Sequence, residues 1–284
     1  MSVLQRTKKQ HYVPQVYLRG FSADSKMIWR YDADSLKEGK LVPIKSICYE
    51  EDLYELFDNE GKLLDPNYLE KTLSKLESMY GRYIRELEKK AFIKENYNTK
   101  CFLTKSEKTF WKLFIAIQML RDPAVLDAAV TTSKKFFGDE LLPNEARNFV
   151  FEQTFPFFSV QKEEENTVFK SIAEPLKKMS LTVCVCETGT LFTSDTPICC
   201  IATNLIDSNK NAMIIVPLTV KLVLVLTGGE LQKLHGKNRL LPLSDVDVKL
   251  FKSSVAHSAK RWLFTSRPFN KDDMTIISGA RNAK

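Results

Sequence analysis

The segment 113–121 constrains the fold most strongly, because nearly all of its side chains are apolar. Only Gln118 and Arg121 are polar within it. A helix that is apolar all round belongs in the centre of a protein rather than on its surface. A Thr-x-x-Glu pattern at 104–107 resembles a capping box, which sets the start of this helix. We therefore predict a central helix that runs from the capping box to Leu120.

The remaining hydrophobic patterns divide the chain into three sections. A short helix is predicted between Pro14 and Gly20, and strands are predicted at 27–31, 41–48 and 53–57. Helices are predicted at 69–87, 104–120, 124–137, 144–153 and 167–179, with a connection over 155–166. Strands at 181–186, 191–194, 212–216 and 221–227 precede a helix capped by Ser244 and a strand at 262–265.

This order of elements predicts an α+β fold in one domain that covers residues 1–284. We expect a small N-terminal β section, central helices, and a C-terminal mixed sheet with a packed helix. Apolar residues make up 44% of the chain and include 18 Phe, which is enough for a sizeable core and argues against disorder.

The cellular compartment follows from two absences in the sequence. No apolar run approaches the roughly 20 residues that cross a bilayer, so no membrane association is expected. The N-terminus is polar and lacks the apolar core of a signal peptide. The six cysteines are then expected to be reduced, small core residues of a cytoplasmic protein.

The positive charge of the chain is concentrated near its C-terminus. The net charge is +7, and residues 221–284 hold 12 Lys or Arg against 5 Asp or Glu, a surplus of +7. A basic C-terminal quarter suits a polyanionic partner such as nucleic acid or a nucleotide. The charges are spread rather than clustered, which also fits a surface that only maintains solubility.

Two polar residues of the central helix form the first candidate group. Gln118 and Arg121 are one turn apart and face the same way. A buried guanidinium keeps its charge and needs an anionic partner. An internal salt bridge and an anion-binding arginine at the floor of a cleft both satisfy this requirement.

The end of the predicted strand 191–194 supplies the second candidate group. Ser194 and Asp195 follow an apolar run and precede Pro197. Catalytic side chains often occupy strand ends, where a sheet holds them rigidly. Asp195 could serve as a base, a metal ligand or the partner of an arginine, or it could cap its own turn.

The opening segment supplies the third candidate group. Gln15 and Arg19 are four residues apart and share a helix face, and His11 lies just before this helix. Histidine titrates near neutrality without help, although a lone histidine is more often a surface or core residue. Glu70 and Glu77, two turns apart on the helix 69–87, are either a further acidic pair or part of a solvated face.

These segments together resemble a family of mostly bacterial proteins known as domain of unknown function 4238. The matching stretches include H-Y-V-P-Q-V-Y-L-R-G-F at 11–21, L-E-K-T-L-S-K-L-E at 69–77, I-Q-M-L-R-D-P at 117–123, F-T-S-D-T-P-I at 192–198 and A-K-R-W-L-F-T at 259–265. The chain departs from the family pattern in two places. It lacks the usual Asn in the last helix, at 251–254, and has R-D-P where R-T-P is usual.

The resemblance implies that eight positions of this sequence match the family's motif residues. They are His11, Gln15, Arg19, Glu77, Gln118, Arg121, Ser194 and Asp195. The resemblance implies no activity, so function has to be argued from the side chains.

We weigh two functions for these residues. The first is an enzyme acting on a phosphate-containing substrate, a nucleotide or nucleic acid, for instance in bacterial defence or a mobile element. Arg19 and Arg121 would bind the anion with Gln15, Gln118 and Ser194, and His11 would be general acid or base. Asp195 or Glu77 would orient His11 or hold a metal.

The second function is a non-catalytic binding or interaction module whose polar motif residues form a buried structural network. The chain contains no phosphate loop, dinucleotide fingerprint, nucleophile elbow or metal-spaced Cys/His cluster. The sequence therefore assigns no cofactor and no metal, and it leaves the oligomeric state open.

Overall fold

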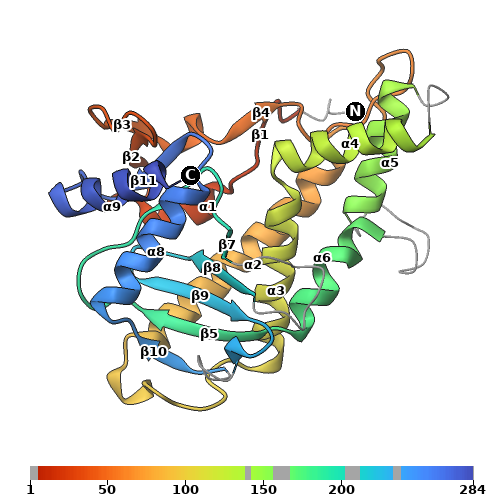
Figure 1. Ribbon diagram of the computed structural model, residues 1–284. Coiled ribbons are helices and arrows are strands. Elements are labelled where there is room, and N and C mark those ends of the chain that lie inside the picture. Colours follow the sequence, from red (N-terminus) through yellow and green to blue (C-terminus); the bar gives the residue numbers. More distant parts are fainter. Residues whose placement is uncertain (1–5, 138–141, 156–166, 202–211, 233–237, 284) are drawn as a thin grey trace.

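The computed structural model describes residues 6–137, 142–155, 167–201, 212–232 and 238–283. The connection predicted over 155–166 lies almost entirely outside the described residues. The arrangement is α+β, as the sequence predicts, with three sheets and a set of helices around them (Figure 1).

The helices account for about half of the described chain. The α-helices are α1 (Gln15–Leu18), α2 (Tyr68–Ala91), α3 (Lys105–Leu120), α4 (Pro123–Phe137), α5 (Pro143–Thr154), α6 (Thr167–Lys178), α8 (Asp245–Ser258) and α9 (Lys271–Asn282). Three 3-10 turns are η1 (Arg19–Phe21), η2 (Ile44–Ser46) and η3 (Lys94–Asn96).

The strands are short and are shared among the three sheets. The first four are β1 (Lys9–His11), β2 (Met27–Asp32), β3 (Lys40–Pro43) and β4 (Tyr49–Glu51). The others are β5 (Ser180–Val185), β6 (Thr193–Ser194), β7 (Cys199–Ile201), β8 (Met213–Pro217), β9 (Leu222–Thr227), β10 (Leu240–Pro242) and β11 (Trp262–Thr265).

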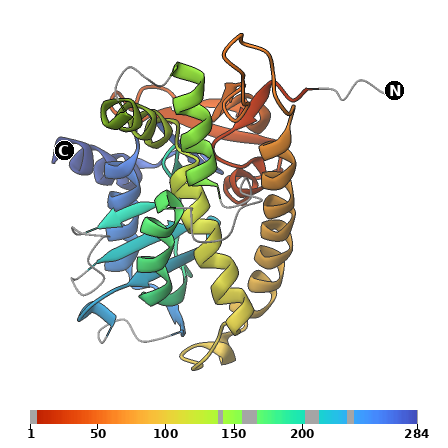
Figure 2. The same cartoon turned by 90° about the vertical axis from the view of Figure 1, so that its right-hand side faces the viewer.

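The largest sheet is mixed and has helices on both faces. Its order is β10-β5-β9-β8-β7, with β10 parallel to β5 and the other neighbours antiparallel. The helices α2, α3 and α6 lie on one face and α8 on the other (Figure 2). Both faces of the central strand β9 are therefore covered, and all six of its residues are buried.

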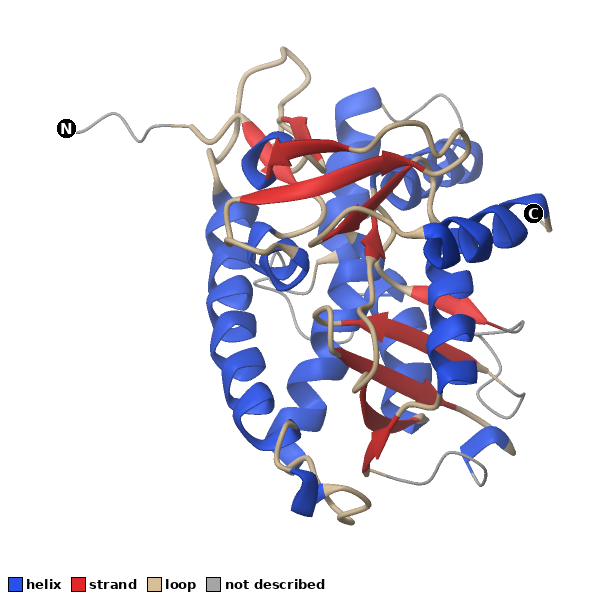
Figure 3. Cartoon of the chain, turned by 90° about the vertical axis from the view of Figure 1, so that its left-hand side faces the viewer, coloured by secondary structure: helices blue, strands red, loops and turns tan. Residues whose placement is uncertain are grey.

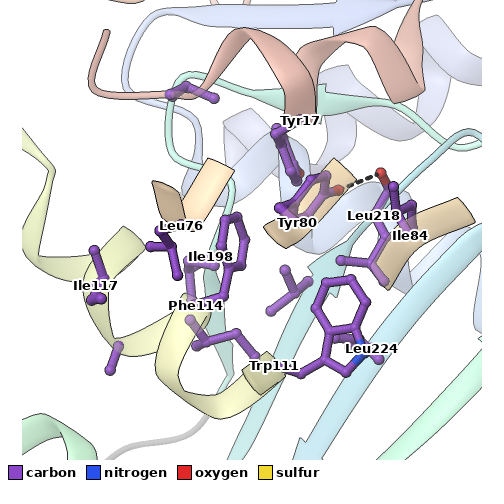
Figure 4. Packing of buried hydrophobic residues seen from close by; sticks show 14 of the residues in the cluster. Tyr17, Leu76, Tyr80, Ile84, Trp111, Phe114, Ile117, Ile198, Leu218 and Leu224 are labelled. Carbon is purple, nitrogen blue, oxygen red and sulfur yellow. Dashed lines mark hydrogen bonds between the residues drawn. The ribbon is translucent and has the colours of Figure 1, made fainter. Parts of the chain in front are cut away.

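The central helix α3 begins with the capping box that the sequence predicts. The side chain of Thr104 accepts from the backbone N–H of Glu107, whose carboxylate accepts from the backbone N–H of Thr104 at 2.7 Å, which completes the capping box. Trp111 and Phe114 of this helix pack against Tyr80 of α2 and against the sheet (Figure 4). The apolar surface of α3 thus joins α2 to the sheet.

A four-stranded sheet joins the two ends of the chain. Its order is β3-β2-β11-β6, and β11 lies antiparallel between β2 and β6 (Figure 3). The predicted N-terminal β section is therefore completed by strands from the last third of the sequence. This pairing makes a single domain of the described chain.

Several predicted boundaries in the N-terminal section are wrong. The strand predicted at 41–48 ends at Pro43, because η2 follows and Cys48 has a left-handed φ of 54°. The strand predicted at 53–57 is absent, and β4 lies just before it, paired with β1. His11 is therefore the last residue of a strand.

Gly20 has a different role from the one predicted. It lies inside η1, so it does not end the short helix. A Cβ at Gly20 would stand 2.7 Å from the backbone oxygen of Leu218, and the Gly20 oxygen accepts from the N–H of Val220 at 3.0 Å. Gly20 therefore allows the opening segment to lie against the β8–β9 turn.

Pro123 begins a second helix, as the separate helices predicted at 104–120 and 124–137 require. The helix α3 ends at Leu120, and α4 begins at Pro123. The carboxylate of Asp122 accepts from the backbone N–H of Ala124 at 3.0 Å, which caps the new helix.

The strands β7 and β10 and the helix α9 are absent from the sequence-based prediction.

The cysteines have free thiols, as predicted. Four are buried, and Cys184, Cys186 and Cys199 pack in the apolar cluster that α8 covers. Cys101 and Cys200 are exposed, so two of the six are not core residues. No helix in the described part of the chain combines the length and apolarity needed to span a bilayer.

Candidate functional site

Arg121 lies at the end of α3 and has a partner for each of its nitrogen atoms. Its side chain is 1% exposed, and its Nη1 is 2.9 Å from Oε1 of Glu77. Its Nη2 donates to the backbone oxygen of His11, and its Nε donates to the Tyr54 hydroxyl at 3.4 Å. Burial alone would lower the pKa of Arg121, but Tyr54 and Glu77 raise it above its ordinary value. The charge is therefore permanent and internally paired.

Gln118, one turn before Arg121 on α3, binds the backbone of Tyr12, the residue after His11. Its Nε2 donates to the backbone oxygen of Tyr12 at 2.7 Å. Gln118 and Arg121 thus fix two consecutive carbonyl groups at the end of β1, as their shared helix face allows. The Oε1 of Gln118 is buried and has no hydrogen-bond partner in the described structure.

Acidic side chains of α2 and of the segment before it surround Arg121. Burial raises the pKa of Glu70 to about 7; Arg121 opposes this rise, whereas Glu77 and Glu55 add to it. Glu55 is 1% exposed and accepts from Nε2 of Gln10 at 2.7 Å. Sequence reasoning missed Glu55 and Gln10, because neither lies on a periodic element.

His11 is half-buried beside this network. Burial lowers the pKa of its imidazole to about 4, and the charge of Arg121 adds to the shift. The ring also has a hydrogen bond to the backbone of Lys45, and its Nε2 is buried without a partner in the described structure. The imidazole is therefore neutral at pH 7.

Asp195 and Ser194 organise the turns that lead into β11 and out of β6. One carboxylate oxygen of Asp195 accepts from the N–H of Lys260 at 3.0 Å, and the other from those of Arg261 and Trp262 at 2.9 and 3.1 Å. Burial raises the pKa of Asp195, and these hydrogen bonds oppose the rise. The Ser194 hydroxyl bonds only to the backbone of Thr196.

Gln15 and Arg19 lie apart from Arg121 and line a surface pocket of about 400 Å³. This anion pocket also contains Lys26 and Lys45, and its other lining residues are Ser25, Met27, Pro43 and Ile44. Three exposed cationic residues therefore line this pocket, with no carboxylate in the lining. The nearby carboxylate of Asp24 accepts from the backbone N–H groups of Lys26 and Met27.

A second lysine-lined pocket of about 410 Å³ lies between α3 and α6 and was not singled out from the sequence. Lys105, Lys108, Lys112 and Lys177 line it over an apolar floor that includes Phe169. Burial lowers the pKa of Lys112 to about 8, and Lys108 adds to the shift. The Lys112 ammonium donates to the backbone oxygens of Lys177 and Met179, which caps the end of α6.

Seven of the eight motif residues therefore occupy three places, and Ser194 is bonded to the backbone of Thr196. His11, Glu77 and Arg121 belong to the buried network, and Gln118 lies beside it. Gln15 and Arg19 line the anion pocket. Gln118 and Asp195 line a third pocket, beside Tyr12. None of five pockets in the described part of the chain brings His11, Arg121 and Asp195 together. Within the described ranges, no three His, Cys, Asp or Glu side chains are grouped to hold a metal ion.

A comparison with protein families decides the identity of the chain. The family model described as Protein of unknown function (DUF4238) matches residues 9–268. The chain belongs to the DUF4238 family. No curated protein and no solved structure matches it. The DUF4238 match covers all eight motif residues and leaves the function to be argued from the geometry.

Proposed function

We propose that this DUF4238 protein binds a phosphate-bearing ligand, a nucleotide or the backbone of a nucleic acid, in the anion pocket. The presence of Arg19, Lys26 and Lys45 without a carboxylate in the lining carries the proposal. Charge-assisted hydrogen bonds to phosphate oxygens are about twice as strong as neutral ones. None of these three ammonium or guanidinium groups has an ion pair within the described part of the chain.

The size and the rigidity of the pocket support this proposal. A volume of about 400 Å³ falls within the range of small-molecule sites. The wall formed by α1 is fixed, because the buried Tyr17 hydroxyl donates to the backbone oxygen of Pro217 at 2.7 Å and bonds to Thr193 at 2.8 Å. The Gln15 amide adds a polar group that can orient the ligand.

We assign Glu77, Arg121 and Asp195 to non-catalytic, structural roles. Glu77 and the His11 carbonyl are partners of Arg121, and the carboxylate of Asp195 is occupied by three backbone N–H groups. Such a binding module, with a basic C-terminal quarter, would act in a bacterial cytoplasm on nucleic acid or nucleotides, for instance in defence or in a mobile element.

Catalysis on the bound phosphate ester is a second candidate, and His11 is the observation in its favour. Its ring bonds to the backbone of Lys45, which lines the anion pocket, and its Nε2 has no partner in the described structure. A neutral imidazole with a free nitrogen can accept a proton. Phosphorus NMR of the bound ligand would then detect turnover that His11→Ala abolishes.

The binding proposal is tested by calorimetric titration of ADP and of a short single-stranded oligonucleotide. We expect Arg19→Ala and Lys45→Ala each to weaken binding about tenfold, since each removes a charge-assisted contact. Lys37→Ala is the matched control, because this exposed lysine lies outside the pocket lining. Higher salt should weaken binding of the oligonucleotide more than that of ADP, since the oligonucleotide makes more phosphate contacts.

Two results would contradict the binding proposal. One is the absence of binding by either ligand. The other is binding that survives Arg19→Ala and Lys45→Ala but is lost in Lys108→Ala, which would move the ligand to the pocket between α3 and α6.

A further inference from the structure

Two adjoining pockets between β4, α4 and the β6–β7 connection form a cleft that the anion-binding proposal does not use. They have volumes of about 140 and 270 Å³ and share Tyr12, Asp122 and Asp195 in their linings. We call the two pockets together the acidic cleft, because the carboxylates of Glu50 and Asp127 also line the larger pocket. The cleft lies on residues from five separate parts of the chain.

The charge of the acidic cleft is strongly unbalanced. Four carboxylates, from Glu50, Asp122, Asp127 and Asp195, face one lining cation, Lys260. The ammonium of Lys260 pairs with Asp122 and also attracts Glu50 and Asp195. Arg147, outside the lining, attracts Glu50 and Asp127, so four carboxylates face two cations. Burial raises the pKa of Glu50, and Asp127 adds to the rise, whereas Arg147 opposes it.

Two residues that line the inner pocket each have a buried polar atom without a partner in the described structure. These atoms are Oε1 of Gln118 and Oγ1 of Thr196, both shielded from solvent. Gln118 is 4% exposed, and its Nε2 is already committed to the Tyr12 carbonyl, so its oxygen is the amide atom left to accept. A buried acceptor without a donor is unfavourable, so a ligand that offers an N–H group to Gln118 Oε1 would gain a hydrogen bond there.

The remaining walls are apolar, and the carboxylates are dispersed. Met119, Val125, Pro197 and Ile198 line the inner pocket. The carboxylates do not form a group of three that could coordinate one metal ion within the described residues. A ligand that suits this lining therefore carries positive charge and N–H donors on an aliphatic chain.

We propose that the acidic cleft binds an organic cation, an aliphatic guanidine or amine, with its chain against the apolar wall. Its N–H groups would donate to Gln118 Oε1 and Thr196 Oγ1, and its charge would lie among Glu50, Asp127 and Asp195. Lys260 already places one ammonium in the mouth of the cleft. This site is separate from the anion pocket, so either proposal can fail without the other.

The test is calorimetric titration of the whole chain with agmatine, 1,4-diaminobutane and a blocked tripeptide with a central arginine. The tripeptide distinguishes an arginine side chain from a free guanidine, and binding of either supports the proposal. We expect Glu50→Gln to weaken binding about tenfold and the isosteric Thr196→Val about fivefold. Glu51→Gln is the matched control, because neighbouring strand residues face opposite ways and Glu51 is outside the lining.

Three results would overturn the proposal. Failure of all three organic cations to bind would do so directly. Equal weakening by Glu50→Gln and Glu51→Gln would attribute binding to net charge rather than to the cleft. Binding of Mg²⁺ or Ca²⁺ that displaces agmatine and is lost in Glu50→Gln would assign the cleft to a metal.

Discussion

Arg121 carries a full positive charge at a position that is 1% exposed, and its partners explain how it remains there. A carboxylate, a hydroxyl and a backbone carbonyl are its three acceptors. The spacing of Gln118 and Arg121 predicts that they face the same way, and both hold the end of β1. The sequence could not select Glu77 as the partner, because the approach of α2 to α3 is tertiary.

At the same scale, we predict that Arg121→Met lowers the free energy of unfolding by about 3 kcal/mol. The loss arises because the substitution leaves Glu77 and the His11 carbonyl without their donor. Urea unfolding measures it, with Arg121→Met/Glu77→Gln as the companion variant. The double variant should lose less than the sum of the two single losses. A loss below about 1 kcal/mol for Arg121→Met would show that the pair contributes little to the scaffold.

Glu70 yields a prediction about pH. Its pKa in the folded chain is about 7 against an ordinary value of 4.5, so the folded state favours the protonated carboxyl. The resulting stabilisation is complete below pH 4.5 and is lost as the pH rises through 7. We expect Glu70→Gln to stabilise the protein by about 3 kcal/mol at pH 8 and by little at pH 4. An equal effect of Glu70→Gln at both pH values in urea unfolding would contradict the assigned shift.

Among the elements, long helices with a regular hydrophobic period are predicted from the sequence, whereas very short strands are not. The helices α2 and α3 are long and periodic, and both are predicted within a few residues. The strands β1 and β4 have three residues each, which is too short for an alternating pattern. Their pairing places His11 in a strand and so changes its surroundings.

The strand β11 depends on a side chain from another part of the sequence. Asp195 accepts from the backbone N–H groups of Lys260, Arg261 and Trp262, where β11 begins. We predict that Asp195→Ala lowers the free energy of unfolding by about 3 kcal/mol, because these N–H groups lose their acceptors. Urea unfolding and amide hydrogen exchange check this, and protection should fall first at 260–262. Unchanged protection at 260–262 would show that Asp195 does not stabilise the start of β11.

At the scale of the whole molecule, the two ends of the sequence meet in one sheet. The α+β class and the mixed C-terminal sheet follow from the order of hydrophobic patterns, but the insertion of β11 between β2 and β6 does not. This pairing separates the motif residues into the buried network, the anion pocket and the acidic cleft. Membership of the same sequence motif therefore does not show that two residues share a pocket.

The two motif arginines have different roles in this proposal: Arg19 binds the ligand, and Arg121 stabilises the fold. The most direct test measures ADP affinity and urea unfolding for Arg19→Ala and Arg121→Met. We predict that Arg19→Ala weakens binding about tenfold, with the free energy of unfolding unchanged within about 0.5 kcal/mol. We also predict that Arg121→Met lowers the free energy of unfolding by about 3 kcal/mol, with affinity retained in the folded fraction. Loss of affinity in a stable Arg121→Met variant, with Arg19→Ala unaffected, would contradict these roles.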